Sequence, residues 1–169
     1  MCKFTQLNVF SKMQLNLPSA NLRLSIDSNG NKTVFDRLRN KFVALTPEEW
    51  VRQHFVTYLI ESKGFPAGLM ANEMAITLNG TRRRCDTVVM DRYGNPIAIV
   101  EYKAPHVAVT QKVFNQIVRY NMTLHVRYLI VSNGISHFCC VIDYGDTAAY
   151  RFLPDVPDYQ TMLSNSDNT

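Results

Sequence analysis

Apolar residues recur along the chain with two different periods, and the dominant period changes from segment to segment. The stripe at helical spacing consists of Val51, Phe55, Tyr58 and Leu59. Thr46 is a favourable N-cap ahead of this stripe, and Pro47 suits the first helical position. Glu49 has the spacing that completes a capping box, and Gly64 favours termination. These signals predict a helix that begins at Pro47 and ends at Gly64.

Strand-like runs follow this helix and are separated by short turns. The runs cover residues 69–78, 84–91 and 96–103. Asn79-Gly80 lies between the first two runs and is the strongest short hairpin signal in the chain. Residues 92–95 separate the second run from the third and are typical of a four-residue loop. The three runs therefore predict an antiparallel meander.

A helical pattern returns at residues 110–124, and two further strand-like runs occupy residues 128–134 and 135–143. A helix between strands is typical of a crossover connection, which makes a mixed sheet. The predicted fold class is α/β, with a helix, a three-stranded antiparallel meander, a crossover helix and further strands.

The two ends of the chain are less regular than its centre. Residues 21–45 are strand-like around a turn signal at residues 28–31 and predict a small β extension. The expected organisation is an N-terminal arm and β extension over residues 1–32, a core domain over 33–154, and a flexible tail over 155–169. The tail is rich in Pro, Asp and Ser.

Hairpin turns fix the register of the strands that they connect, so the partners can be counted from the sequence. If Asn79-Gly80 is a two-residue turn, Leu78 lies opposite Thr81. The same count places Glu73 opposite Asp86.

The loop at residues 92–95 gives the second count. It places Asp91 opposite Pro96 and, further along the strands, Asp86 opposite Glu101. Both counts together predict a row of three carboxylates, from Glu73 through Asp86 to Glu101, across neighbouring strands.

Lys103 lies two residues after Glu101 and is predicted to share its face of the strand, opposite Arg84. Directly opposed like charges destabilise a sheet, and a divalent cation would explain the row of carboxylates. The predicted site therefore binds Mg²⁺ (or Mn²⁺) through Asp86 and Glu101, and Lys103 is catalytic. The alternative is a solvated surface ion pair between Glu101 and Lys103. Glu73 would leave the row if a bulge turned it to the other face.

Composition and charge narrow the class of protein. The 169 residues suit one domain, and the net charge of +4 is compatible with a polyanionic partner. The four cysteines lack zinc-site spacing and are interpreted as reduced thiols; the adjacent pair Cys139 and Cys140 should point to opposite faces of a strand. No long apolar run and no secretory signal are present, which predicts a cytoplasmic protein without membrane contact.

The segment from Cys85 to Pro105 resembles the PD-(D/E)xK nuclease signature, in which an Asp begins one strand and Glu-x-Lys ends the next. Over residues 33–143 the chain resembles the N-terminal nuclease domain of type I restriction enzyme R subunits, in its short, free-standing bacterial form. The stretches that carry this resemblance are LTPEEWVRQHF, RCDTVV, IVEYKAP, YLIVSNG, Glu73 and Gln116-x-x-x-Tyr120. The resemblance implies a restriction-endonuclease-like core and a metal-dependent nuclease that acts on DNA.

Residue by residue, the resemblance implies that Asp86 and Glu101 bind Mg²⁺, with the backbone carbonyl of Tyr102 as a further ligand, and that Lys103 is catalytic. Gln116 and Tyr120 match a helix motif that lies beside the metal and contacts DNA; packing of Tyr120 in the core is the alternative.

Other residues near the site are more ambiguous. Arg84 is expected to bind the phosphate backbone, with a solvated strand start as its alternative. Glu48 and Glu49 open the first helix, where related folds place an acidic residue near the metal, but a capping box would account for Glu49.

The chain departs from R subunits because it contains no GxxxxGK[ST] phosphate loop. Translocation by this chain alone is therefore not expected, and a partner protein could supply recognition or translocation. A homodimer is a second compatible assembly, and RNA stays open as a substrate. The competing hypothesis is a non-catalytic nucleic-acid-binding or assembly module that retains the nuclease fold.

Overall fold

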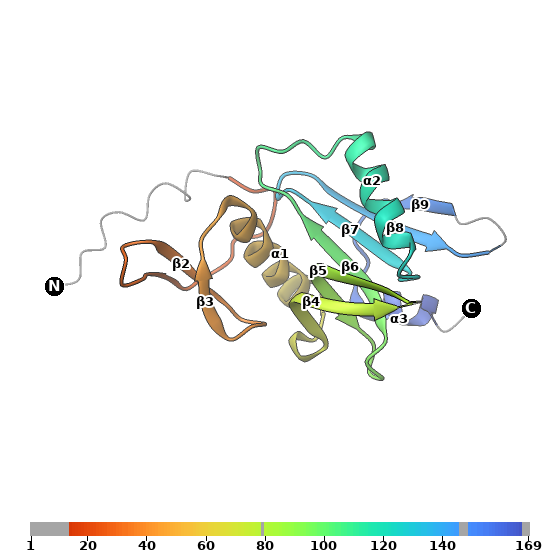
Figure 1. The fold of residues 1–169 in the computed structure, drawn as a ribbon, viewed down its shortest axis with the longest axis horizontal. Helices are drawn as coiled ribbons and strands as arrows, with labels where there is room; N and C mark the ends of the chain where they lie inside the picture. The colour runs from red at the N-terminus through yellow and green to blue at the C-terminus, as the bar shows by residue number, and fades with distance from the viewer. Residues whose placement is uncertain (1–13, 79, 146–148, 167–169) are drawn as a thin grey trace.

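The computed structural model describes residues 14–78, 80–145 and 149–166, without the side chains of Leu78, Arg83, Tyr120 and Ser166. It contains a small and a large sheet, and the arrangement is mixed α/β as predicted (Figure 1). The small sheet has the order β1 (Leu24–Ile26), β2 (Lys32–Asp36), β3 (Lys41–Ala44). The large sheet has the order β4 (Met70–Leu78), β5 (Thr81–Met90), β6 (Pro96–Tyr102), β7 (Tyr128–Ser132), β8 (His137–Asp143), β9 (Ala149–Leu153).

Helix α1 (Pro47–Lys63) begins and ends as the sequence predicts. The Thr46 hydroxyl accepts a hydrogen bond from the Glu49 amide at 3.0 Å. Gly64 has a left-handed backbone with φ of 69°, and its amide donates to the Leu59 carbonyl. The reciprocal half of the capping box is absent, because the Glu49 carboxylate bonds to Arg39, Arg52 and Gln53. The prediction that a capping box accounts for Glu49 is therefore wrong.

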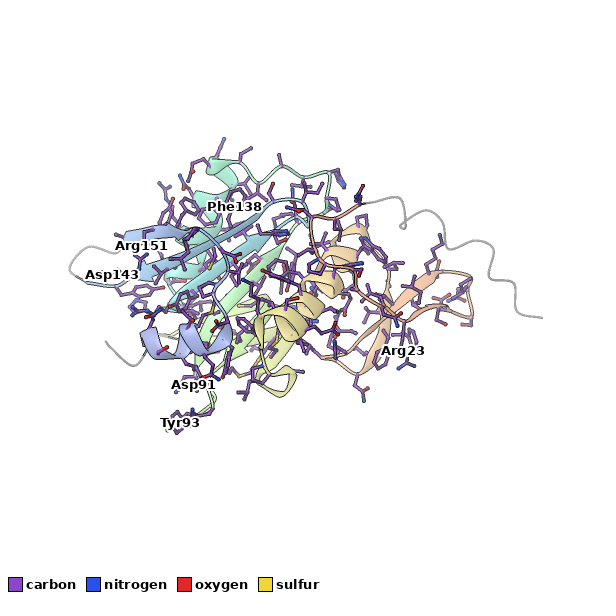
Figure 2. All side chains as sticks on the ribbon, turned by 180° about the vertical axis from the view of Figure 1, so that it is seen from behind. Arg23, Asp91, Tyr93, Phe138, Asp143 and Arg151 are labelled. Atoms are coloured by element: carbon purple, nitrogen blue, oxygen red, sulfur yellow. The ribbon has the colours of Figure 1, made fainter. Side chains whose placement is uncertain are left out.

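The hairpin count is confirmed for β4 and β5, since Leu78 pairs with Thr81 and the register continues to the far end of both strands. The second count is wrong at the turn itself. Met90, not Asp91, pairs with Pro96. Asp91 is part of the loop (Figure 2), and its side chain accepts hydrogen bonds from the backbone amides of Tyr93 and Asn95. A register shift between Val89 and Met90 absorbs the difference, so the remaining pairs of β5 and β6 follow the predicted register.

Helix α2 (Gln111–Met122) is the crossover that lets β6 and β7 pair in parallel. It covers one face of the large sheet, while α1 and α3 (Tyr159–Ser166) cover the other. The α1-side core includes Phe55, Leu59, Val100, Tyr102, Ile130 and Met162. The α2-side core includes Cys85, Val88, Ile99, Phe114, Val118 and Val131. Cys139 packs in the first core and Cys140 in the second, which confirms that these neighbours point to opposite faces. Both are free thiols, as is Cys85.

Both expected boundaries of the core domain differ from the structure. A boundary after residue 32 would separate β1 from β2, although these strands pair through Leu24 and Val34. The expected flexible tail contains α3, whose Tyr159 and Met162 are buried in the α1-side core. The sequence analysis missed this helix because the segment is largely polar and only two of its described side chains, those of Tyr159 and Met162, are buried. No helix among the described residues is long and apolar enough to cross a membrane.

The N-terminal segment is tied to the turn between β7 and β8. The Asn16 amide donates to the Gly134 carbonyl at 2.8 Å, and Leu15 packs against the α1-side core. Gly134 has a φ of 82°, and a Cβ atom there would lie 2.7 Å from Leu15 Cδ2 and 3.1 Å from Val51 Cγ2. Both the backbone and the packing therefore require glycine at this turn.

We expect Gly134→Ala to lower the free energy of unfolding by about 2–4 kcal/mol, because it adds steric overlap to an unfavourable left-handed backbone. Gly94→Ala is the matched control: its φ is 84°, but nothing lies within 4 Å of an added Cβ. The control should lose only the backbone contribution of about 1–2 kcal/mol. Urea unfolding of both variants measures the difference, and equal losses would show that Leu15 does not pack as described.

Candidate active site

The regular alternation of β4 and β5 is interrupted where Glu73 meets Asp86. In a regular strand, residues two apart share a face. Asn72 and Thr87 hydrogen-bond to each other at 2.6 Å, and Thr87 also contacts the Tyr102 hydroxyl in the α1-side core. Two residues away on each strand, however, Met74 and Cys85 pack in the α2-side core.

On β4 this interruption coincides with the backbone of Glu73, whose φ is 55°. This left-handed conformation is uncommon for a residue with a side chain and is typical of functional or constrained positions. The regular pairs on either side keep the predicted register, so Glu73 still lies level with Asp86. The irregular backbone directs the Glu73 carboxylate to Arg52 of α1, the same residue that binds Asp86.

Arg52 is the centre of this part of the structure, and its side chain is only 4% exposed. Its Nη1 donates to Glu49 Oε2 at 2.6 Å. Its Nη2 lies 2.8 Å from Glu73 Oε1 and 3.1 Å from Asp86 Oδ1. Burial opposes the charge of Arg52, but these carboxylates outweigh burial and raise its pKa. One buried cation thus joins α1 to both β4 and β5.

Asp86 is held by two groups on different elements. Its Oδ1 faces Arg52, and its Oδ2 accepts the backbone amide of Tyr102 at 2.9 Å. The Tyr102 ring is fully buried, and the Arg52 guanidinium lies 5.6 Å from its centroid. The Asp86 carboxylate therefore has a fixed orientation beside the end of β6.

Glu101 and Lys103 lie at this end of β6. Glu101 is half-buried, and neither of its carboxylate oxygens has a hydrogen-bond partner among the described residues. Burial, and then the charge of Asp86, raise the pKa of Glu101 to about 8, although Lys103 opposes the rise. The Lys103 amide donates to the Ser132 carbonyl, which fixes the chain just beyond the strand.

Glu48 is a further acidic residue near Asp86, and the sequence analysis did not include it among the site residues. Burial is the main cause of its raised pKa, followed by the charge of Asp86, and Lys103 again opposes the rise. Its carboxylate is 4.0 Å from Arg52. Glu48 and Arg52 are four residues apart on α1, a spacing that places them on one helix face. This spacing was the feature of the sequence that could have indicated that Glu48 and Arg52 lie together at the site.

The other predicted site residues are placed differently: Arg84 contacts the site through Glu73, whereas Gln116 lies on α2. Arg84 is 71% exposed and pairs with Glu73. Gln116 is exposed on α2, where it lines a hollow with Lys112, Asn115 and Arg119, and no described interaction joins it to Asp86 or Glu101. Tyr120 belongs to α2, but its side chain lies outside the described part of the chain.

Protein side chains at this site could supply only some of the ligands of a metal ion. Among the described residues, no three His, Cys, Asp or Glu side chains are placed to hold an ion together. A divalent cation is not the only charge that offsets the row of carboxylates, because Arg52 already pairs with Glu73 and Asp86. The donor set nevertheless fits Mg²⁺, which commonly takes one or two carboxylates and completes its shell with water and phosphate oxygens. Asp86 and Glu101 would supply those carboxylates.

The fold and the site together define a mixed α/β domain with an Asp on one strand and Glu-x-Lys at the end of its neighbour. Residues 47–157 match the family described as Type I restriction enzyme R protein N terminus (HSDR_N), and the chain belongs to this family. The resemblance found in the sequence is thereby confirmed. No match was found among curated proteins.

Solved structures with a similar arrangement are distant. The chain is 17% identical to DrdV in a cryo-electron microscopy structure of its DNA complex, with a TM-score of 0.41 over 70% of this chain. It spans only 12% of the length of that protein. It is 12% identical to a candidate nuclease of the DUF820 group from Anabaena variabilis, with a TM-score of 0.40 over 83% of this chain and 88% of the other.

We expect the metal-free protein to lose stability as pH rises from about 4.5 to about 8, because of Glu101. Between these values the folded protein keeps a proton on Glu101 that the unfolded chain has released, so the free energy of unfolding falls with pH. The slope from one such proton is at most about 1.4 kcal/mol per pH unit. Glu101→Gln should flatten this part of the profile and make the variant more stable than wild type near pH 8.

Urea unfolding in the presence of a chelator, at pH 5.5, 7.0 and 8.5, measures both proteins. Parallel profiles for wild type and Glu101→Gln would show that Glu101 is not protonated in the folded state at neutral pH.

Proposed function

We propose that this protein is a metal-dependent nuclease that hydrolyses DNA phosphodiester bonds, with Mg²⁺ or Mn²⁺ as cofactor. The observation that carries the proposal is the placement of Asp86 and Glu101 on neighbouring strands, with Lys103 just beyond. Family membership supports the same chemistry. Asp86 and Glu101 would be the side-chain ligands, and the Tyr102 backbone carbonyl between Glu101 and Lys103 would be a third ligand. Glu73 is a weaker candidate because it pairs with two arginines.

A bound Mg²⁺ supplies positive charge that polarises the phosphate and lowers the pKa of an attacking water. Lys103 orients that water and offsets the negative charge that develops on the phosphate oxygens. The water oxygen forms a bond to phosphorus while the bond to the leaving oxygen breaks. The water gives up a proton and the leaving oxygen gains one, so hydrolysis needs no other reactant.

Exposed cationic and polar side chains near the ends of the large sheet are suited to bind a nucleic-acid backbone. Arg84 is largely exposed on β5, and α2 presents Lys112, Gln116 and Arg119 on one hollowed surface. We assign DNA as the substrate on this basis together with the family, and RNA is tested beside it. A partner protein or a second copy of the chain would add recognition or translocation.

The second candidate is a nucleic-acid-binding or assembly module without cleavage activity. Arg52 favours it, since this residue already pairs with Asp86 and Glu73 and offsets part of their charge without any metal. Calorimetric titration with Mn²⁺ separates the two candidates, because a module without affinity for the ion at Asp86 and Glu101 is not the enzyme proposed.

We expect metal-dependent cleavage of DNA by the wild-type protein, and a loss of about 100-fold or more in Asp86→Asn, Glu101→Gln and Lys103→Met. The assay uses supercoiled, linear and single-stranded DNA and single-stranded RNA, each with Mg²⁺ or Mn²⁺. Asp143→Asn is the control: Asp143 is an exposed carboxylate at the end of β8 (Figure 2) and should retain wild-type activity. DNA binding without cleavage by wild type, under every metal condition, would favour the binding module.

A further inference from the structure

We infer that Arg52 is a positioning residue for this site, which acts as a permanent internal cation that orients Asp86 for its role at the metal. The inference rests on the proposed function for its catalytic consequence, but the orientation of Asp86 can be measured without metal. The contacts of Arg52 separate the acidic residues of the site into two groups with different tasks.

Arg52 is itself held in place. Its anchor is Glu49, which is buried and also accepts hydrogen bonds from Arg39 at 3.0 Å and Gln53 at 2.8 Å. Glu49 lies in the first turn of α1, whose start is fixed by the Thr46 cap. A guanidinium with one nitrogen on such an anchor has little freedom, so its other nitrogen defines a fixed position.

That second nitrogen determines how Asp86 is oriented. Arg52 Nη2 binds Asp86 Oδ1, and the Tyr102 amide binds Oδ2. Donors on both oxygens fix the plane of the carboxylate. Each oxygen has two lone pairs and thus keeps one that these donors do not use. The carboxylate is therefore positioned and still able to bind a cation beside Glu101.

The same nitrogen gives Glu73 a different task. Glu73 Oε1 contacts Arg52 Nη2, and its other oxygen pairs with Arg84. With both oxygens in ion pairs, Glu73 balances the charge of the arginines. Glu49 and Glu73 therefore serve as ion-pair partners of the arginines. Asp86 and Glu101 are the carboxylates that can bind the metal.

The test compares Arg52→Met with Arg52→Lys and with Arg37→Met as a control. Arg37 also pairs with a carboxylate of α1, Glu61 at 3.1 Å, but this pair is exposed and no described interaction joins Arg37 to Glu49 or Asp86. Lys at position 52 keeps the charge but lacks the fork that bridges Glu49 and Asp86. It is also the variant to use if Arg52→Met does not fold.

Three readouts are measured: hydrogen exchange of the Tyr102 amide in metal-free protein, the Kd for Mn²⁺, and kcat and KM for DNA cleavage. We expect Arg52→Met to speed Tyr102 exchange, to weaken Mn²⁺ binding by about 10–100-fold, as is typical when a residue that orients a metal ligand is lost, and to lower kcat more than it raises KM. Arg52→Lys should fall between Arg52→Met and wild type. Arg37→Met should match wild type in Tyr102 exchange and Mn²⁺ affinity.

The inference is overturned if Arg52→Met and Arg52→Lys match Arg37→Met in Tyr102 exchange and Mn²⁺ affinity. Failure of the proposed function gives a different pattern, because wild type itself would then neither bind Mn²⁺ nor cleave DNA. In that case Tyr102 exchange alone decides whether Arg52 orients Asp86.

Discussion

One buried cation, Arg52, joins helix α1 to strands β4 and β5 through the carboxylates around it. Burying a charge is costly unless it is paired, and removing one member of a buried pair leaves the other uncompensated. Arg52 meets this constraint by bonding to Glu49 on its own helix and to Glu73 and Asp86 on two strands. The helix and the hairpin are thus joined at the point where the strand alternation breaks. The left-handed backbone of Glu73 is the local cost of bringing its carboxylate to this cation.

Local rules predicted those parts of the fold that depend on neighbours in sequence. The cap at Thr46, the end of α1 at Gly64 and the hairpin register from Leu78 and Thr81 all follow from short signals. The count also placed Asp86 level with Glu73 and near Glu101, even though Met90 rather than Asp91 pairs with Pro96. Errors at a turn do not spread when a bulge absorbs them.

What the sequence did not reveal depends on contacts between distant segments. The sequence analysis did not single out Arg52, because its carboxylate partners Glu73 and Asp86 lie on strands 21 and 34 residues further along the chain. Glu49 was assigned to a local cap for the same reason. The helix α3 was missed because its burial comes from Tyr159 and Met162 within a polar stretch. Short-range patterns do not contain such pairings, and only the folded arrangement shows which polar residues are buried.

Asp86 and Glu101 differ in their contacts with the rest of the protein, and this difference bears on whether the site is catalytic. Asp86 has a structural reason to be an acid, since it caps the Tyr102 amide and pairs with Arg52. Glu101 has a weaker one: it is half-buried beside Asp86, without a hydrogen-bond partner among the described residues, and burial and the charge of Asp86 raise its pKa more than Lys103 lowers it. A neutral side chain would serve the fold better at this position. A binding module that had lost its chemistry could therefore keep Asp86 for stability, whereas Glu101 contributes only where a cation or a reaction requires its charge.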